Sequence, residues 1–156
     1  MKIMRTEMLA LTIVVCLLTG CGGSEKADGV PVLAIGEDAC AACGMKVADA
    51  GYAAAARLPD GQTLAYDAIE CLVRDLRVRR GDGAPAGIWL PDFASGGELK
   101  PAADMTVVLA DYPSPMGGGY AAFADPAVAA AEAASRDGVA GPLQGFVDGT
   151  LRRPAR

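Results

Sequence analysis

Two cysteines and a methionine lie close together in the run Cys40-Ala41-Ala42-Cys43-Gly44-Met45, in a chain that contains no histidine. Thiolate and thioether sulfur atoms are soft ligands, which favour Cu(I), zinc and iron–sulfur chemistry. Without imidazole the chain has no neutral nitrogen ligand to add to these sulfurs. The residue types and their spacing therefore predict a site for cuprous copper, Cu(I).

Residues 1–20 have the features of a bacterial lipoprotein signal peptide. Lys2 and Arg5 precede the apolar run Met8–Leu18, which is too short to span a bilayer, and small residues stand immediately before Cys21. We therefore expect Cys21 to be acylated and to become the first residue of the mature protein. Multiple acyl chains anchor a protein stably, so the mature chain is expected on a bacterial cell membrane, facing the periplasm.

Residues 21–30 comprise this cysteine and a small, polar segment with the composition of a flexible tether. Gly22 follows the cysteine, where aspartate would resemble an inner-membrane retention signal, so the outer membrane is the expected location. The chain carries a formal net charge of −5. Phosphate recognition needs clustered Lys and Arg, so we expect no binding to nucleic acid.

The remaining sequence predicts the same order of elements twice. In residues 31–95 the predicted elements are strands at 52–58 and 62–66, a helix at 68–80 capped by Asp67, and a strand at 87–93. In residues 96–156 they are strands at 105–111 and 120–124, a helix at 126–135 capped by Asp125, and a strand at 143–147. The fold class expected is therefore α+β, with two similar ββαβ units in tandem.

The chain resembles a known family, NosL, in the order and identity of several motifs. The matching segments are the lipoprotein Cys21, Cys43-Gly44-Met45, Tyr66-Asp67-Ala68-Ile69-Glu70-Cys71-Leu72, Trp89-Leu90-Pro91-Asp92-Phe93, Pro115-Met116-Gly117-Gly118-Gly119 and Ala122-Phe123. NosL proteins are copper-binding accessory lipoproteins of nitrous oxide reductase maturation in denitrification. The resemblance implies tandem ββαβ units and a Cu(I) chaperone that is not an enzyme. It also implies apo nitrous oxide reductase, or another periplasmic cuproprotein, as the recipient.

Three ligands are expected for the Cu(I) ion. Cys43 supplies a thiolate, and Met45 would face the same side as Cys43 if this segment were extended. Met116 is the third ligand, because its glycine-rich loop matches the family pattern. Cys40 and Cys71 are further candidates, although a helical Cys71 also suits a small buried apolar residue.

Two other functions compete with this interpretation. Cys40 and Cys43 could form a disulfide in an oxidising compartment and serve as a thiol–disulfide redox pair, but Ala41-Ala42 and the following glycine do not resemble a thioredoxin-type motif. A structural zinc ribbon would need a fourth ligand beyond Cys40, Cys43 and Cys71, and no histidine supplies one.

Overall fold

The computed structural model describes residues 29–79 and 81–153. The expected signal peptide, the acylated Cys21 and nearly all of the expected tether therefore lie outside the described residues. None of the helices in the described part is both long and apolar enough to cross a bilayer.

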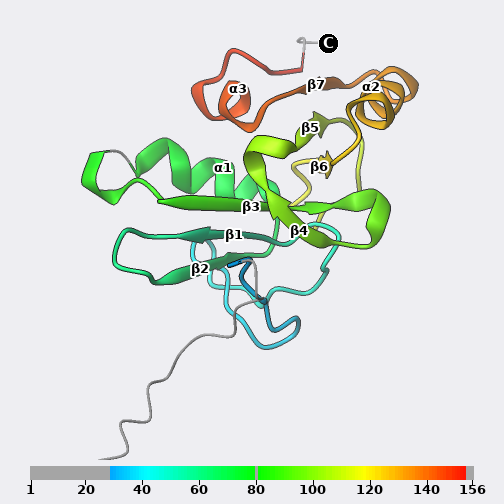
Figure 1. The fold of residues 1–156 in the computed structure, drawn as a ribbon. Helices are drawn as coiled ribbons and strands as arrows, with labels where there is room; N and C mark the ends of the chain where they lie inside the picture. Colours follow the sequence, from blue (N-terminus) through cyan, green and yellow to red (C-terminus); the bar gives the residue numbers. More distant parts are fainter. Residues whose placement is uncertain (1–28, 80, 154–156) are drawn as a thin grey trace, which may run out of the picture.

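Four antiparallel strands form the first sheet, in the order β2-β1-β3-β4 (Figure 1). Its elements are β1 (Ala54–Arg57), β2 (Thr63–Tyr66), α1 (Ile69–Val78), β3 (Gly87–Asp92) and β4 (Glu98–Pro101), with 3-10 turns at Gly81–Gly83, Phe93–Ser95 and Ala102–Asp104. The predicted ββαβ order is confirmed here. The fourth strand, β4, was not predicted, because a short edge strand that carries Lys100 and ends in Pro101 lacks the apolar alternation of a buried strand.

The second sheet has three antiparallel strands, in the order β6-β5-β7. The elements are β5 (Thr106–Leu109), β6 (Tyr120–Phe123), α2 (Pro126–Ser135), β7 (Val139–Gly141) and α3 (Leu143–Asp148). The unit repeats the first one, since the initial strand lies in both sheets between the second and third strands. Asp125 caps α2 as predicted, with its side chain accepting a hydrogen bond from the Ala127 backbone.

The strand predicted at 143–147 is wrong, because this segment is helix α3. Leu143, Phe146 and Val147 follow the i, i+3, i+4 spacing of one helix face, and the same cluster of buried residues contacts all three. The third strand of the second unit is instead β7, which precedes α3.

One hydrophobic core joins the two units. Ile69 and Leu72 of α1 belong to the same buried cluster as Leu90 of β3, Val107 of β5 and Phe146 of α3. Helix α1 therefore lies between the first sheet and the second unit (Figure 1). The division of the chain between residues 95 and 96 stays a prediction, and β4, which follows that position, pairs with β3 of the first sheet.

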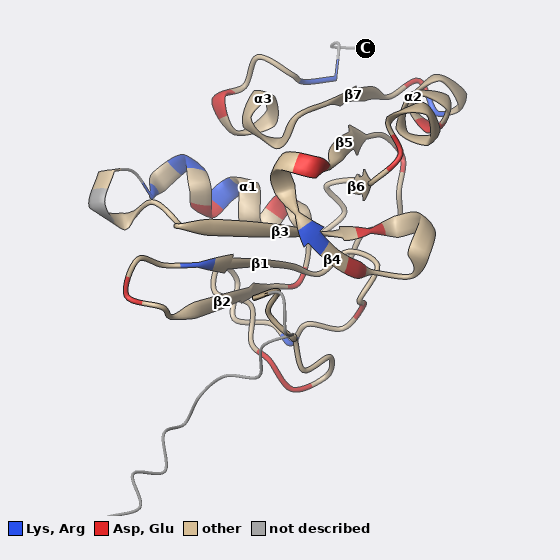
Figure 2. Cartoon of the chain, in the orientation of Figure 1, with Lys and Arg blue, Asp and Glu red and all other residues tan. Residues whose placement is uncertain are grey.

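Asp92, at the end of β3, links the two units through its carboxylate. Its Oδ2 lies 3.0 Å from Nζ of Lys100 on β4, and its Oδ1 accepts a 3.3 Å hydrogen bond from the backbone of Ala124. Figure 2 shows basic and acidic residues side by side on β4. Glu98 is a second, longer contact of Lys100, at 3.7 Å. Burial opposes ionisation of Asp92, but the hydrogen bonds from Lys100 and Ala124 outweigh it and lower its pKa.

Replacing Asp92 with asparagine is expected to lower the free energy of unfolding by about 1 kcal/mol at neutral pH, because a partly buried charge-assisted contact with Lys100 is lost. A group with a depressed folded-state pKa stabilises the fold above its unfolded pKa and loses that contribution as the pH falls through its folded pKa. The stability difference between wild type and Asp92→Asn should therefore shrink at acidic pH. Urea unfolding of both proteins at neutral and acidic pH measures this difference in the free energy of unfolding. A difference that is the same at both pH values would contradict the prediction.

Candidate metal centre

The run Cys40–Met45 folds into a tight turn. The Gly44 backbone N–H donates to the carbonyl of Cys40 at 2.8 Å, and the Cys40 N–H donates to the carbonyl of Met45 at 2.7 Å. Gly44 has a φ of 74°, in the left-handed region that favours glycine. The segment is therefore not extended, and the alternation expected to bring Met45 to the same side as Cys43 does not apply.

Helix α1 brings a third thiol to this turn. Sγ of Cys71 lies 4.0 Å from Sγ of Cys43, and the sulfur atoms of Cys40, Cys43 and Cys71 all lie within 4.8 Å of one another. All three are free thiols. One helical turn after Cys71, Arg74 donates to the carbonyl of Ala42 at 3.1 Å and so ties the turn to the same helix.

Asp67 supports the turn from the other side and does not cap α1 as predicted. The N-cap position is Ala68, which has no side-chain hydrogen bond. The buried carboxylate of Asp67 instead accepts a 2.9 Å hydrogen bond from the backbone of Ala48, just beyond the turn. The side chain is recruited by a loop distant in sequence, whose backbone would otherwise lack this acceptor.

The three thiols have different environments. Burial disfavours a Cys40 thiolate, but hydrogen bonds from the backbone N–H groups of Asp67, Ala42 and Cys43 outweigh burial and lower its pKa. Burial raises the pKa of Cys71, and the negative charge on Cys40 raises it further. The fold therefore favours the thiolate form at Cys40 more than at Cys71, and a metal ion would displace thiol protons on binding.

The spacing of the sulfurs fits one metal ion. Three thiolates that each lie about 2.3 Å from a central ion, as they do around zinc, stand about 4.0 Å apart. The Cys43–Cys71 separation matches this value, and the remaining separations are at most 4.8 Å. No fourth cysteine, acidic residue or histidine joins the cluster in the part of the chain that the structure describes. A three-sulfur site suits Cu(I) better than a tetrahedral structural zinc.

The two methionines lie at the surface, whereas Cys40 and Cys71 are buried. The side chain of Met45 is 53% exposed and that of Met116 is 38% exposed. Met116 lies in a turn in which Gly117 N–H donates to the carbonyl of Ser114. Neither is therefore a core filler, which was the structural alternative for both.

Sequence reasoning missed the residues that hold the Met116 loop. Oε1 of Glu70, next to Cys71 on α1, accepts hydrogen bonds from Ser114 Oγ at 2.5 Å and from Gly118 N–H at 2.9 Å. A glycine-rich loop has few side chains of its own to form hydrogen bonds with its backbone, so the sequence indicated that another residue would do so. It did not indicate that this residue is Glu70.

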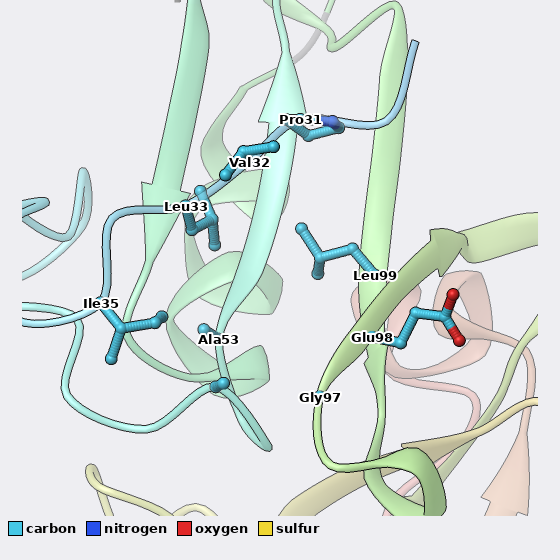
Figure 3. A pocket seen from close by; sticks show the side chains of 9 residues that line it. Pro31, Val32, Leu33, Ile35, Ala53, Gly97, Glu98 and Leu99 are labelled. Atoms are coloured by element: carbon cyan, nitrogen blue, oxygen red, sulfur yellow. The ribbon is translucent and has the colours of Figure 1, made fainter. Parts of the chain in front are cut away.

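The apolar hollow in Figure 3 is a separate feature. Leu33, Ile35 and Leu99 surround a space of about 140 Å³ near the start of the described chain, and none of the three cysteines lines it. The candidate metal centre is therefore defined by convergent sulfur atoms and not by a ligand pocket.

Comparison with known proteins supports the fold. No model of a known protein family matches the sequence, and no curated protein matches it. Among solved structures, the crystal structure of the copper chaperone NosL from Shewanella denitrificans matches with a TM-score of 0.60 at 15% sequence identity. The match covers 72% of this chain and 92% of that chain. The NosL-like architecture predicted from the sequence is thus confirmed, and at this identity the likeness concerns the fold.

Proposed function

We propose that this protein binds one Cu(I) ion and carries it to a copper enzyme. The observation that carries the proposal is the cluster of three free thiols, from the turn Cys40–Cys43 and from α1, with sulfur atoms within 4.8 Å of one another. Soft thiolates favour a cuprous ion. The similar solved structure, which is that of a copper chaperone, supports the same proposal.

The burial of the ligands suits transfer as well as binding. Cys40 and Cys71 are buried, whereas Cys43 is partly exposed and Met45 and Met116 are exposed. In this proposal the buried thiolates hold the ion. The partly exposed Cys43 and the weaker thioether ligands of Met45 and Met116 let a partner's ligands replace the protein's own one at a time. The protein acts as a carrier and not as an enzyme.

The location and recipient follow from the sequence and are part of the same proposal. An acylated Cys21 anchors the protein to a bacterial membrane, more specifically the outer membrane, with the folded part in the periplasm. Fully extended, the ten residues 21–30 would reach at most about 36 Å, which would keep the folded part near the bilayer surface. Apo nitrous oxide reductase is the proposed recipient, with another periplasmic cuproprotein as the alternative.

An anaerobic titration against a chromogenic Cu(I) chelator tests the proposal on the purified, reduced protein. Wild type should bind one Cu(I) ion, Cys43→Ser should bind it far more weakly, and Zn(II) should bind more weakly than Cu(I). Val128→Ala is a control, since Val128 is a 38% exposed side chain of α2 outside the thiol cluster. Failure of wild type to compete with the chelator would overturn the proposal and favour a thiol–disulfide role, which an insulin-reduction assay would detect. Preference for Zn(II) would overturn the proposal in favour of a structural role for the thiols.

A further inference from the structure

We propose that Glu70 is a positioning residue that fixes the loop Ser114–Gly119, and with it Met116, against the metal-binding end of α1. This inference rests on the proposed function, in which Met116 is a Cu(I) ligand. It adds a residue that acts through that ligand without touching the metal itself.

The carboxylate of Glu70 is the centre of a small hydrogen-bond network. Its Oε1 accepts from Ser114 Oγ at 2.5 Å and from Gly118 N–H at 2.9 Å, and Ser114 Oγ accepts in turn from Gly119 N–H at 3.0 Å. Ser114 is itself buried. One carboxylate oxygen and one hydroxyl therefore organise both ends of the Met116 turn.

The loop also fits closely against the same side chain. A Cβ atom on Gly118 would lie 2.8 Å from the Cβ, Cγ and Cδ atoms of Glu70, closer than real contacts of this kind. Gly119 has a φ of 73°, and a Cβ there would lie 2.1 Å from the carbonyl oxygen of Ala110. The absence of a side chain at Gly118 thus lets the backbone rest directly on Glu70, and the absence of one at Gly119 lets the loop pass close to Ala110.

The position of Glu70 on α1 connects this loop to the thiols. Glu70 immediately precedes Cys71, whose sulfur lies 4.0 Å from that of Cys43. The first turn of α1 therefore presents a thiol on one side and holds the Met116 loop on another, and a negative charge is favourable at this end of a helix. The thiol turn has its own supports in Arg74 and Asp67, which do not depend on Glu70.

Removing the carboxylate should consequently affect Met116 and leave the thiols in place. In anaerobic Cu(I) competition, Glu70→Ala should weaken binding by about 10-fold, as loss of an outer support of a metal ligand does. Met116→Ala should weaken binding by a similar factor. The double variant Glu70→Ala/Met116→Ala should bind Cu(I) no more weakly than Met116→Ala alone. Glu70→Gln keeps an acceptor oxygen at the same place and should bind nearly as wild type.

X-ray absorption at the copper edge measures the number of sulfur neighbours of copper, which would not change if Glu70 only stabilised the fold. Glu70→Ala and Met116→Ala should each lose one sulfur neighbour of copper, while Glu70→Gln retains it. Additive affinity losses in the double variant, or wild-type binding by Glu70→Ala, would overturn the inference and leave the proposed function standing. Failure of wild type to bind Cu(I) would instead overturn the proposed function.

Two further measurements keep the test decisive if Glu70→Ala folds poorly. Ser114→Ala removes the hydroxyl but keeps the carboxylate of Glu70. Its loss of Cu(I) affinity should likewise not add to that of Met116→Ala. In the metal-free protein, amide hydrogen exchange at Gly118 should be faster in Ser114→Ala and Glu70→Ala, with exchange at Gly44 in the thiol turn unchanged. Equal exchange at Gly118 in wild type and both variants would contradict the positioning role.

Discussion

Cys71→Ser is expected to weaken Cu(I) binding by about 100-fold while the protein remains folded. Structural zinc sites, which have four ligands, contribute about 10–16 kcal/mol of binding free energy, or about 3 kcal/mol per ligand, and we expect a loss of similar size for one thiolate here. The Cys71 sulfur lies 4.0 Å from that of Cys43, and the other two sulfurs cannot enclose an ion as three do. Anaerobic competition against a chromogenic chelator measures the change in affinity.

The control for this variant must separate ligation from packing, because Cys71 is fully buried on α1. Val73→Ala serves this purpose, since Val73 is buried on the same helix but contributes no ligand atom. Val73→Ala should lower the free energy of unfolding by about 1–3 kcal/mol with little change in Cu(I) affinity. Equal affinity losses in the two variants would mean that Cys71 is only a small apolar residue of the core.

Local patterns predicted most of the fold. The two hairpins, the two main helices and their order were recognisable because alternation, helical spacing and turn residues act over a few neighbouring positions. Three elements escaped this reasoning, namely β4, the short strand β7 and helix α3. The strand β4 is a polar edge strand stabilised by pairing with β3, and α3 is a short helix whose residues Leu143–Val147 suit either a strand or one helix face.

The candidate site shows the same limit more clearly. Cys40, Cys43 and Met45 were identifiable because they share one short segment. The contribution of Cys71 depends on how α1 packs against a turn 28 residues away, and the contacts of Glu70 with Ser114 span 44 residues. Tertiary packing decides which distant segment each face of a helix meets, so the sequence identified Cys71 as a candidate ligand but not its position beside Cys43. For the same reason Asp67 was assigned to a helix cap, whereas a distant loop uses its carboxylate.

Cu(I) binding is expected to raise the melting temperature of the reduced protein by about 12 °C. A ligand that binds only the folded state, at a free concentration of about 1,000 times its Kd, adds about 4 kcal/mol of stability. For a domain of this size each kcal/mol shifts the melting temperature by about 3 °C. Differential scanning calorimetry in an anaerobic Cu(I) buffer, compared with the metal-free protein, measures the shift.

The shift should be this large because the metal would join two parts of the chain that lie far apart in the sequence, the turn Cys40–Met45 and helix α1. Cys40 packs in the core cluster that contains Cys71, and hydrogen bonds from Arg74 to Ala42 and from Ala41 to the carbonyl of Ala65 also hold the turn Cys40–Met45. A metal ion shared by this turn and Cys71 would add a cross-link between the N-terminal loop and the central helix. The double variant Cys43→Ser/Cys71→Ser should therefore show no shift at the same free Cu(I). If Cu(I) raised the melting temperature of the double variant as much as that of wild type, the stabilising ion would bind elsewhere on the protein.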